Sequence, residues 1–222
     1  MIETVVSMGL AVDEAMEIRK NHLAPKVLTG KEKRICIVTG THGDELEGQY
    51  VCYEIIRRIN ENPSCLKGIV DVYPATNPLG VDCMTRGVPM FDLDLNRIFP
   101  GNEHGHMAEY AASKIIEDIA GADVCIDIHA SNVFLREIPQ VRINEQTVDT
   151  LLPLAKELNV DYIWIHAAAT VLESTLAYSL NVRNTPTLVV EMGVGLRITE
   201  SFCHQLTDGI FHLMAQLGIW DG

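Results

Sequence analysis

The chain has 222 residues, a length that suits one well-buried α/β domain, and 47% of them are hydrophobic, as in ordinary globular proteins. Its formal net charge of −13 argues against a nucleic-acid partner, because binding to phosphates needs a basic surface. No apolar run approaches the roughly 20 residues of a membrane span, and the first residues lack the pattern of a signal peptide. We therefore expect one soluble, cytoplasmic domain over residues 1–222, without a membrane partner.

Six cysteines are scattered along the chain without a CxxC pair, and several lie inside apolar runs. Free cysteine is among the most buried residue types, where it behaves as a small hydrophobic side chain. We expect reduced thiols in the core rather than a disulfide framework.

Short β-branched runs alternate with amphipathic stretches along the chain, which favours an α/β fold. The expected strands are Arg34–Thr39, Ile69–Tyr73, Val124–Ile128, Tyr162–Ile165 and Thr187–Val190. The expected helices are Glu47–Asn60, Met107–Ala120, Val148–Leu158, Leu172–Asn181 and Thr199–Leu217, and a long loop is expected between Ala75 and Gly105. Strands that are nearly all apolar are typically buried on both faces, so the pattern predicts a largely parallel sheet covered by helices.

His42 and Glu45 follow the first buried strand and are three residues apart, so a tight turn brings them to one side. Imidazole and carboxylate are good zinc ligands, and a catalytic zinc commonly has three protein ligands and a water. An HxxE pair alone arises by chance in many chains. His129 follows another apolar strand and supplies the expected third ligand, because ligands bind at the carboxyl ends of strands in open α/β sheets.

Glu191 follows a third apolar strand, where a buried carboxylate is costly without a partner. Proton transfer from a zinc-bound water would explain it, although an acidic residue at a helix N-terminus is an alternative. Asp127 could orient one of the imidazoles or make a structural hydrogen bond. Asn96 and Arg97 suit recognition of a carboxylate with a carbonyl, and Arg86 could reach the same space.

In order along the chain, the motifs HxxE, NPxG, DLNRxFPG, DxH and ExG resemble the succinylglutamate desuccinylase/aspartoacylase family of the zinc carboxypeptidase clan, from about Ile35 to Gly195. The resemblance implies a mixed, mostly parallel twisted sheet with helices on both faces. It also implies one Zn²⁺ per chain and a set of roles: His42, Glu45 and His129 as metal ligands, Glu191 as general base, Arg86 on the oxyanion, and Asn96 and Arg97 on the substrate carboxylate.

Two features depart from that family. Arg86 lies farther from the Asp92–Arg97 motif than in human-type aspartoacylases, which bears on the substrate. The C-terminal β domain of many relatives is absent from the sequence before Gly222, so we expect a minimal form or a partner that covers the site.

The other polar residues have ordinary explanations. A second metal site in the loop of His104 and His106 is the less favoured interpretation, because that loop reads as solvated. His166 closes a strand and could lie near the site, but a packing role is favoured. Arg136 and Arg183 are expected to be surface or salt-bridge residues rather than to bind a substrate. The Asp92-Leu93-Asp94 run lacks the spacing of a calcium loop.

The sequence thus predicts a zinc-dependent hydrolase that cleaves the amide bond of a small N-acyl amino acid, a deacylase. A zinc carboxypeptidase acting on peptides shares the same chemistry and remains an alternative. A non-catalytic, metal-stabilised binding protein is the third hypothesis, and a homo-oligomer stays open.

Overall fold

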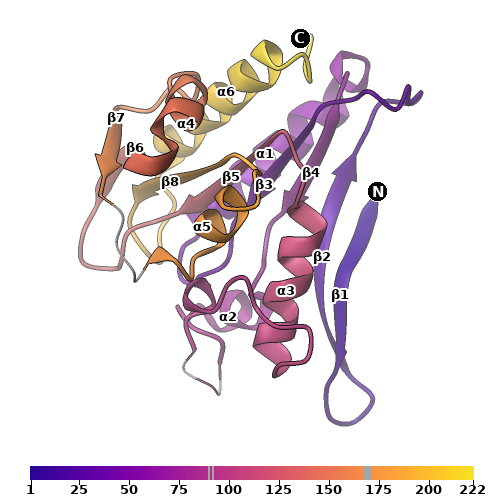
Figure 1. The fold of residues 1–222 in the computed structure, drawn as a ribbon, viewed down its shortest axis with the longest axis vertical. Helices are drawn as coiled ribbons and strands as arrows, with labels where there is room; N and C mark the ends of the chain where they lie inside the picture. Colours follow the sequence, from indigo (N-terminus) through magenta and orange to yellow (C-terminus); the bar gives the residue numbers. More distant parts are fainter. Residues whose placement is uncertain (90, 92, 168–171) are drawn as a thin grey trace.

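The fold is that of a computed structural model, which describes residues 1–89, 91, 93–167 and 172–222. In this part of the chain, eight strands form one sheet in the order β1-β2-β4-β3-β5-β8-β6-β7 (Figure 1). The strands are β1 Ile2–Gly9, β2 Ala15–Leu23, β3 Arg34–Val38, β4 Ile69–Tyr73, β5 Val124–His129, β6 Glu137–Asn144, β7 Tyr162–His166 and β8 Thr187–Gly193. The α-helices are α1 Glu47–Glu61, α2 Pro78–Cys83, α3 Met107–Ile119, α4 Val148–Ala155, α5 Leu176–Asn181 and α6 Glu200–Gln216.

The centre of the sheet is parallel and its margins are mixed. Strands β4, β3, β5 and β8 are parallel neighbours, and β7 is parallel to β6. Strand β6 is antiparallel to β8, and the β1–β2 hairpin joins β4 in antiparallel fashion. The predicted mixed, mostly parallel sheet is therefore confirmed, and the carboxyl ends of β3, β5 and β8 lie at one edge.

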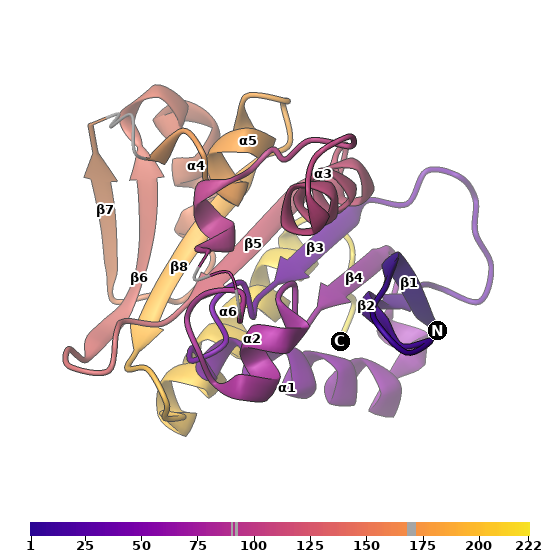
Figure 2. The same ribbon diagram turned by 90° about the horizontal axis from the view of Figure 1, so that it is seen from below.

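Two hydrophobic cores lie on opposite faces of the sheet, with α1 and α6 on one side and α3 and α5 on the other (Figure 2). One face of β3 and β5 contributes Ile35, Ile37 and Ile126 to the core under α1 and α6. The alternate residues, such as Cys36 and Cys125, point to the core under α3 and α5. Helices on both faces were predicted, and this arrangement confirms them.

All five expected strands and all five expected helices are present, with ends shifted by a few residues. The largest shift is in α5, which begins at Leu176 rather than at Leu172. The interpretation of residues 75–105 as a loop is wrong in part, because α2 and a 3₁₀ turn at Leu95–Arg97 lie there. Strand β6 and the β1–β2 hairpin were not predicted.

The expectation that β7 is buried on both faces is wrong. It is an edge strand of the sheet, and Tyr162, Trp164 and Ile165 are all exposed. Composition alone does not separate a buried apolar strand from an edge strand that borders a cavity.

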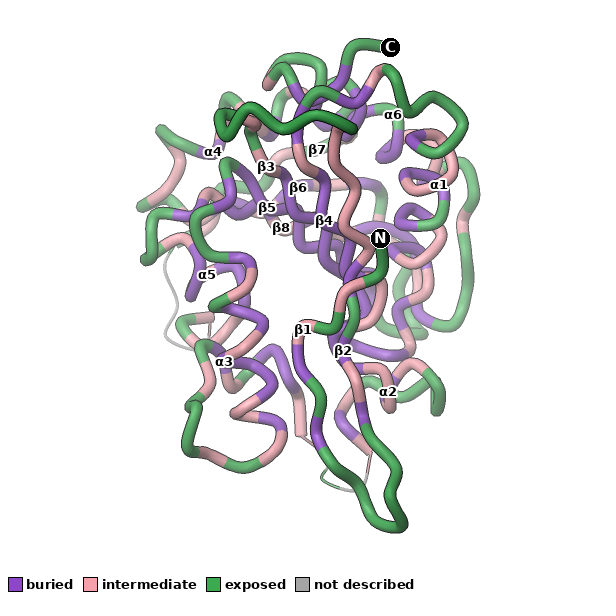
Figure 3. The backbone as a smooth tube through the Cα atoms, turned by 90° about the vertical axis from the view of Figure 1, so that its right-hand side faces the viewer, coloured by how far each residue is buried: buried purple, intermediate pink, exposed green. Residues whose placement is uncertain are grey.

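The N-terminal hairpin is amphipathic, with buried and exposed positions alternating along both strands (Figure 3). Its inward residues Val6, Met8, Met16 and Ile18 join the core of α3. Lys20 is also buried, and its ammonium group lies 2.8 Å from Asp118 of α3. An ion pair thus allows a lysine to occupy an inward position of β2.

The six cysteines are free thiols, and four of them are buried, namely Cys36, Cys52, Cys125 and Cys203. The expectation of core thiols does not extend to Cys83, which is exposed. Among the described helices, none is long and apolar enough to cross a lipid bilayer.

Candidate metal centre and active site

The turn after β3 presents His42 and Glu45 at the edge of the sheet. Gly40 has a φ of +69°, a backbone conformation that glycine adopts without strain. At Gly43 a Cβ atom would lie 1.9 Å from the carbonyl carbon of Gly80, so this turn packs directly on the backbone of α2. Glycine at position 40 therefore lets the chain turn after β3, and glycine at position 43 leaves room for the backbone of α2.

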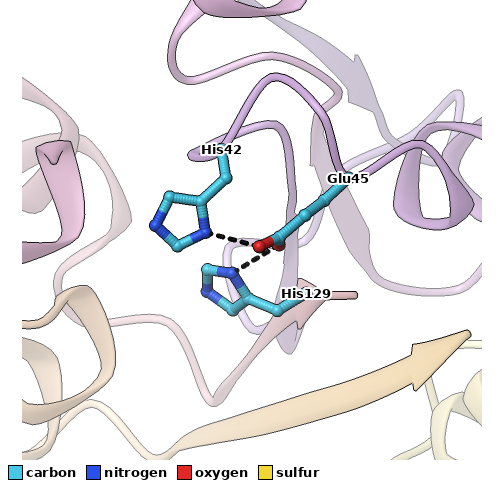
Figure 4. Close-up of side chains that lie close together, drawn as sticks. All are labelled: His42, Glu45 and His129. Carbon is cyan, nitrogen blue, oxygen red and sulfur yellow. Dashed lines mark hydrogen bonds and ion pairs between the residues drawn. The ribbon is translucent and has the colours of Figure 1, made fainter. Parts of the chain in front are cut away.

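His42, Glu45 and His129 are buried and lie together (Figure 4). Their potential ligand atoms are all within 4.8 Å of one another. The Glu45 carboxylate lies between the two rings, with Oε1 2.7 Å from Nδ1 of His42 and Oε2 3.0 Å from Nδ1 of His129. Oε2 also accepts a hydrogen bond from the backbone N–H of Ala130, 3.0 Å away. The carboxylate therefore ties the turn after β3 to the end of β5.

The outer nitrogen of each ring faces an aspartate. Nε2 of His42 is 3.0 Å from Oδ1 of Asp94, and Nε2 of His129 is 3.2 Å from Oδ1 of Asp127. The second pair is within ion-pair range but lacks hydrogen-bond geometry, and both Asp127 oxygens are buried without a hydrogen-bond partner among the described residues. In metal sites, a carboxylate commonly lies beside the histidine nitrogen that does not bind the metal. The two aspartates lie in the corresponding positions.

The local field favours positive charge. Burial opposes ionisation of His129, but Asp127 and Glu45 outweigh it and raise the pKa of the imidazole well above its usual range. Burial also opposes ionisation of Glu45, yet the two histidines lower its pKa to about 2. Three carboxylates around two imidazoles thus form a buried site that stabilises a cation.

These residues fit a zinc ion. Two imidazoles and one carboxylate are a common ligand set of catalytic zinc. Both Nδ1 atoms face the same carboxylate, and both Nε2 atoms have an acidic neighbour that can orient the ring. Among the described residues, no other group of three histidine, cysteine or acidic side chains lies close enough to hold a metal.

Glu191 lies in β8 next to His129, because the two residues are register partners of the parallel pair β5–β8. Arg142 of β6 places Nη1 3.2 Å from Glu191 Oε1, and its Nη2 is 2.9 Å from Glu137. Burial raises the pKa of Glu191 to about 7, although His129 and Arg142 oppose this rise. A carboxyl group of this kind changes its protonation state near neutral pH.

Arg86, Asn96 and Arg97 surround the same site. Arg86 lies 3.0 Å from Asp94 and 3.4 Å from Glu45. Asn96 is buried and has its amide nitrogen 3.4 Å from Nε2 of His129, and its Oδ1 accepts from the backbone N–H of Leu176. Arg97 is exposed and donates to the backbone carbonyl of Asn96.

One cavity of about 970 Å³ brings together all seven residues of the predicted site. Sequence reasoning missed Arg142 and Trp164, which line the same cavity. A signal for Arg142 was available, since Val141 and Ile143 alternate with polar residues as in a half-buried strand.

The remaining candidates have different positions. His166 also lines the cavity, contrary to the expectation that it packs. Exposed His104 pairs with Glu103, and the backbone N–H of His106 donates to Glu109 at the start of α3. Arg136 packs over the ring of Phe202, and Arg183 donates to the carbonyl of Ser179. Asp92 lies outside the described residues.

The protein thus combines an α/β sheet, covered by helices on both faces, with a buried His–Glu–His cluster at the ends of its strands. Residues 31–217 match the model of the succinylglutamate desuccinylase/aspartoacylase catalytic domain, and the chain therefore belongs to that family.

Several known proteins are similar. The N-alpha-acetyl-L-2,4-diaminobutyric acid deacetylase of Halomonas elongata is 29% identical over 114 residues, which are 51% of this chain and 33% of that protein. A succinylglutamate desuccinylase from Silicibacter sp. TM1040 has a TM-score of 0.83 at 21% identity, covering 98% of this chain and 65% of its own. A succinylglutamate desuccinylase/aspartoacylase from Rhodobacter sphaeroides has a TM-score of 0.81 at 22% identity. The match covers 95% of this chain and 62% of that chain. The chain thus spans about a third of the curated relative and under two thirds of these structures.

Proposed function

We propose that the chain is the catalytic unit of a zinc-dependent amide hydrolase that removes the acyl group from a small N-acyl amino acid. The observation that carries this proposal is the buried cluster of His42, Glu45 and His129 with Glu191 beside it in one cavity. The family of the chain and the deacetylase of Halomonas elongata support the same class of reaction.

His42, Glu45 and His129 would hold the zinc ion, which when bound lowers the pKa of a water and polarises the amide carbonyl. Glu45 contributes a negative charge to the ligand set and is fixed by the N–H of Ala130. Asp94 would keep the His42 ring oriented through a hydrogen bond to its outer nitrogen, and Asp127 would act on His129 through its charge 3.2 Å away.

Glu191 acts as the general base in this proposal. Its carboxylate accepts a proton from the attacking water and returns it to the nitrogen of the leaving amine. Arg142 pairs with Oε1, so Oε2 is the oxygen left to face the water. A pKa of about 7 suits a group that must both take up and release a proton at neutral pH.

The cationic and amide side chains bind the substrate. Arg86, which lies against Glu45 and Asp94, would steady the negative charge that develops on the amide oxygen. Asn96 and Arg97 bind the carboxylate of the amino acid, since a guanidinium offers a planar pair of donors to it.

The first experiment measures metal in the purified protein by mass spectrometry, in wild type, His129→Ala and His104→Ala. We expect about one zinc per chain in wild type and in His104→Ala, whose ring is exposed, and none in His129→Ala. No zinc in wild type, even after incubation with excess metal, would refute the proposed site.

The second experiment screens the zinc-loaded protein for release of amines from N-acyl amino acids, and from peptides with a free or an amidated C-terminus. Release from N-acyl amino acids supports the deacylase. Cleavage of free-ended peptides alone would identify a carboxypeptidase instead. Bound zinc without any turnover would leave a metal-stabilised binding protein.

A further inference from the structure

The cavity is larger than the metal centre and a small substrate require. Its volume of about 970 Å³ is at the upper end of the roughly 300–1,000 Å³ that holds drug-sized ligands. His42, Glu45 and His129 lie at the end over β3 and β5, because the strand order is β3-β5-β8-β6-β7. The other end, the distal half, extends over β6 and β7 and is lined by Arg142, Asn144, Gln146, Trp164, His166 and Asn181.

The sheet places the residues of the distal half in rows. Arg142 of β6 is the register partner of Val189 in β8 and of Trp164 in β7, so the three side chains share one face. Two residues further along these strands, Asn144 of β6 is the register partner of His166 in β7, and both side chains lie on the same face. This is the face on which Glu191 lies, and the distal half is therefore continuous with the proposed catalytic carboxylate.

Trp164 forms an aromatic wall of the distal half, and Arg142 packs against its ring. Its side chain belongs to the edge strand and the residue remains 46% exposed. The guanidinium of Arg142 lies over the ring, 5.3 Å from its centroid. Arg142 is itself held by Glu137 at 2.9 Å and by Glu191 at 3.2 Å. Such a bound cation fixes the ring, and an aromatic surface fixed in advance costs less entropy when a ligand stacks on it.

The positive charge of Arg142 in the distal half is already paired. Glu137 and Glu191 already neutralise Arg142, so the guanidinium offers little to an anionic ligand. Asn144 and Gln146, which also line the distal half, are uncharged amides. Asn144 uses its Oδ1 to accept from the backbone N–H of Gln146, which leaves its NH₂ group to donate. An aromatic wall with amide donors and acceptors suits a neutral ligand that forms hydrogen bonds.

We propose that the distal half is a second binding subsite, which holds an uncharged, amide-rich extension of the substrate's acyl group against Trp164. The opposite end of the substrate, its carboxylate, belongs to Asn96 and Arg97. The inference rests on the proposed function for the identity of the reacting amide, whereas the subsite itself rests on the cavity.

Intrinsic fluorescence can test the subsite directly. The chain has two tryptophans, and Trp220 is buried against Phe211 with ring centroids 5.0 Å apart, so acrylamide quenching reports mainly on Trp164. The probes are N-acetylaspartate and N-acetylglycylglycylaspartate, which share their carboxylates and differ in an uncharged extension. Both are mixed with the zinc-loaded full chain in a stopped-flow instrument, before turnover.

We expect the extended probe to bind about tenfold more tightly than the short one and to protect Trp164 from acrylamide. The variants at position 164 lack this reporter, so their affinities are measured by isothermal titration calorimetry. In Trp164→Ala the advantage in affinity is lost, and Trp164→Phe, which keeps an aromatic wall, retains part of it. Tyr162→Ala is the matched control, because Tyr162 shares the strand and face of Trp164 but is not among the described residues that line the cavity. Circular dichroism verifies that each variant folds.

Equal affinity of both probes for wild type, or an advantage that survives in Trp164→Ala, would overturn the subsite. Protection of Trp164 by the extended probe without hydrolysis of any amide would instead reject the proposed function and retain the subsite. Hydrolysis of short N-acyl amino acids with no advantage in affinity for the extended probe would retain the proposed function and reject the subsite.

Discussion

His129 and Glu191 are register partners across the parallel strands β5 and β8, so their side chains leave the same face of the sheet as neighbours. Backbone hydrogen bonds of the central sheet fix this relationship. His42 reaches the same place from the end of β3, the other neighbour of β5. The candidate site is therefore built on the most buried part of the fold, where side-chain positions vary least.

Replacing Glu191 with glutamine should lower kcat by about 10²–10⁴-fold, because an amide cannot accept the proton of the attacking water. Zinc content should stay at the wild-type level, since Glu191 is not among the proposed ligands. The control is Glu157→Gln, which removes a carboxylate paired with His212 on the surface and should leave kcat unchanged. Full activity of Glu191→Gln would mean that another group is the base.

Replacing Asp127 with asparagine should weaken zinc binding by about 10–100-fold, because the negative charge beside Nε2 would strengthen His129 as a ligand. Competition with a chromophoric chelator measures the affinity. Asp208→Asn serves as the control, because Asp208 pairs with Arg58 on the exposed side of α6. Unchanged affinity in Asp127→Asn would reduce Asp127 to a structural role.

Two glycines with nearly equal positive φ angles should respond differently to alanine. Gly193 and Gly218 have φ values of +73° and +74°, so alanine costs about 1–2 kcal/mol of strain at either position. At Gly193 the added Cβ would lie 1.9 Å from Oε1 of Glu47, whereas at Gly218 it meets no atom within 4 Å. Glu47 accepts from the N–H of Val194, 2.9 Å away, and would have to give up that contact.

We therefore expect Gly193→Ala to lower the free energy of unfolding by at least about 1 kcal/mol more than Gly218→Ala, as measured by urea denaturation. Equal losses in the two variants would show that the Glu47 side chain moves aside at no cost.

The thiols should react in two groups. Burial raises the pKa of Cys36 and of Cys203 to about 12, so both remain protonated and enclosed at pH 8. Cys83 is exposed and should be alkylated first, followed by the half-buried Cys65. Mass spectrometry after a short treatment with iodoacetamide should find labels on these two cysteines, and on the four buried ones only after unfolding. Early labelling of Cys36 would contradict the described core.

The parts of the fold that the sequence predicted are those where local pattern and burial agree. The apolar strands β3, β4 and β5 read clearly because both of their faces are covered. The candidate ligands were identified because polar residues follow such strands abruptly. Whether they act as ligands remains a prediction.

The margins of the sheet were harder to predict. Strand β6 contains charged and polar residues such as Glu137, Arg142 and Asn144, because one of its faces lines a cavity instead of a core. In β2, Lys20 occupies an inward position through an ion pair with Asp118, a partner 98 residues away that no local pattern indicates. These strands depend on tertiary contacts, which a pattern of hydrophobic residues does not contain.

The N-terminal hairpin has a consequence for the boundary of the domain. The family match begins at residue 31, after both strands of the hairpin. Yet Met16 and Ile18 belong to the same core as Ile115 and Ile119 of α3. A fragment cut at the family boundary would leave that helix with an apolar stripe open to water and β4 with a bare edge. The stretch matched by the family model and the unit of folding are thus different parts of this chain.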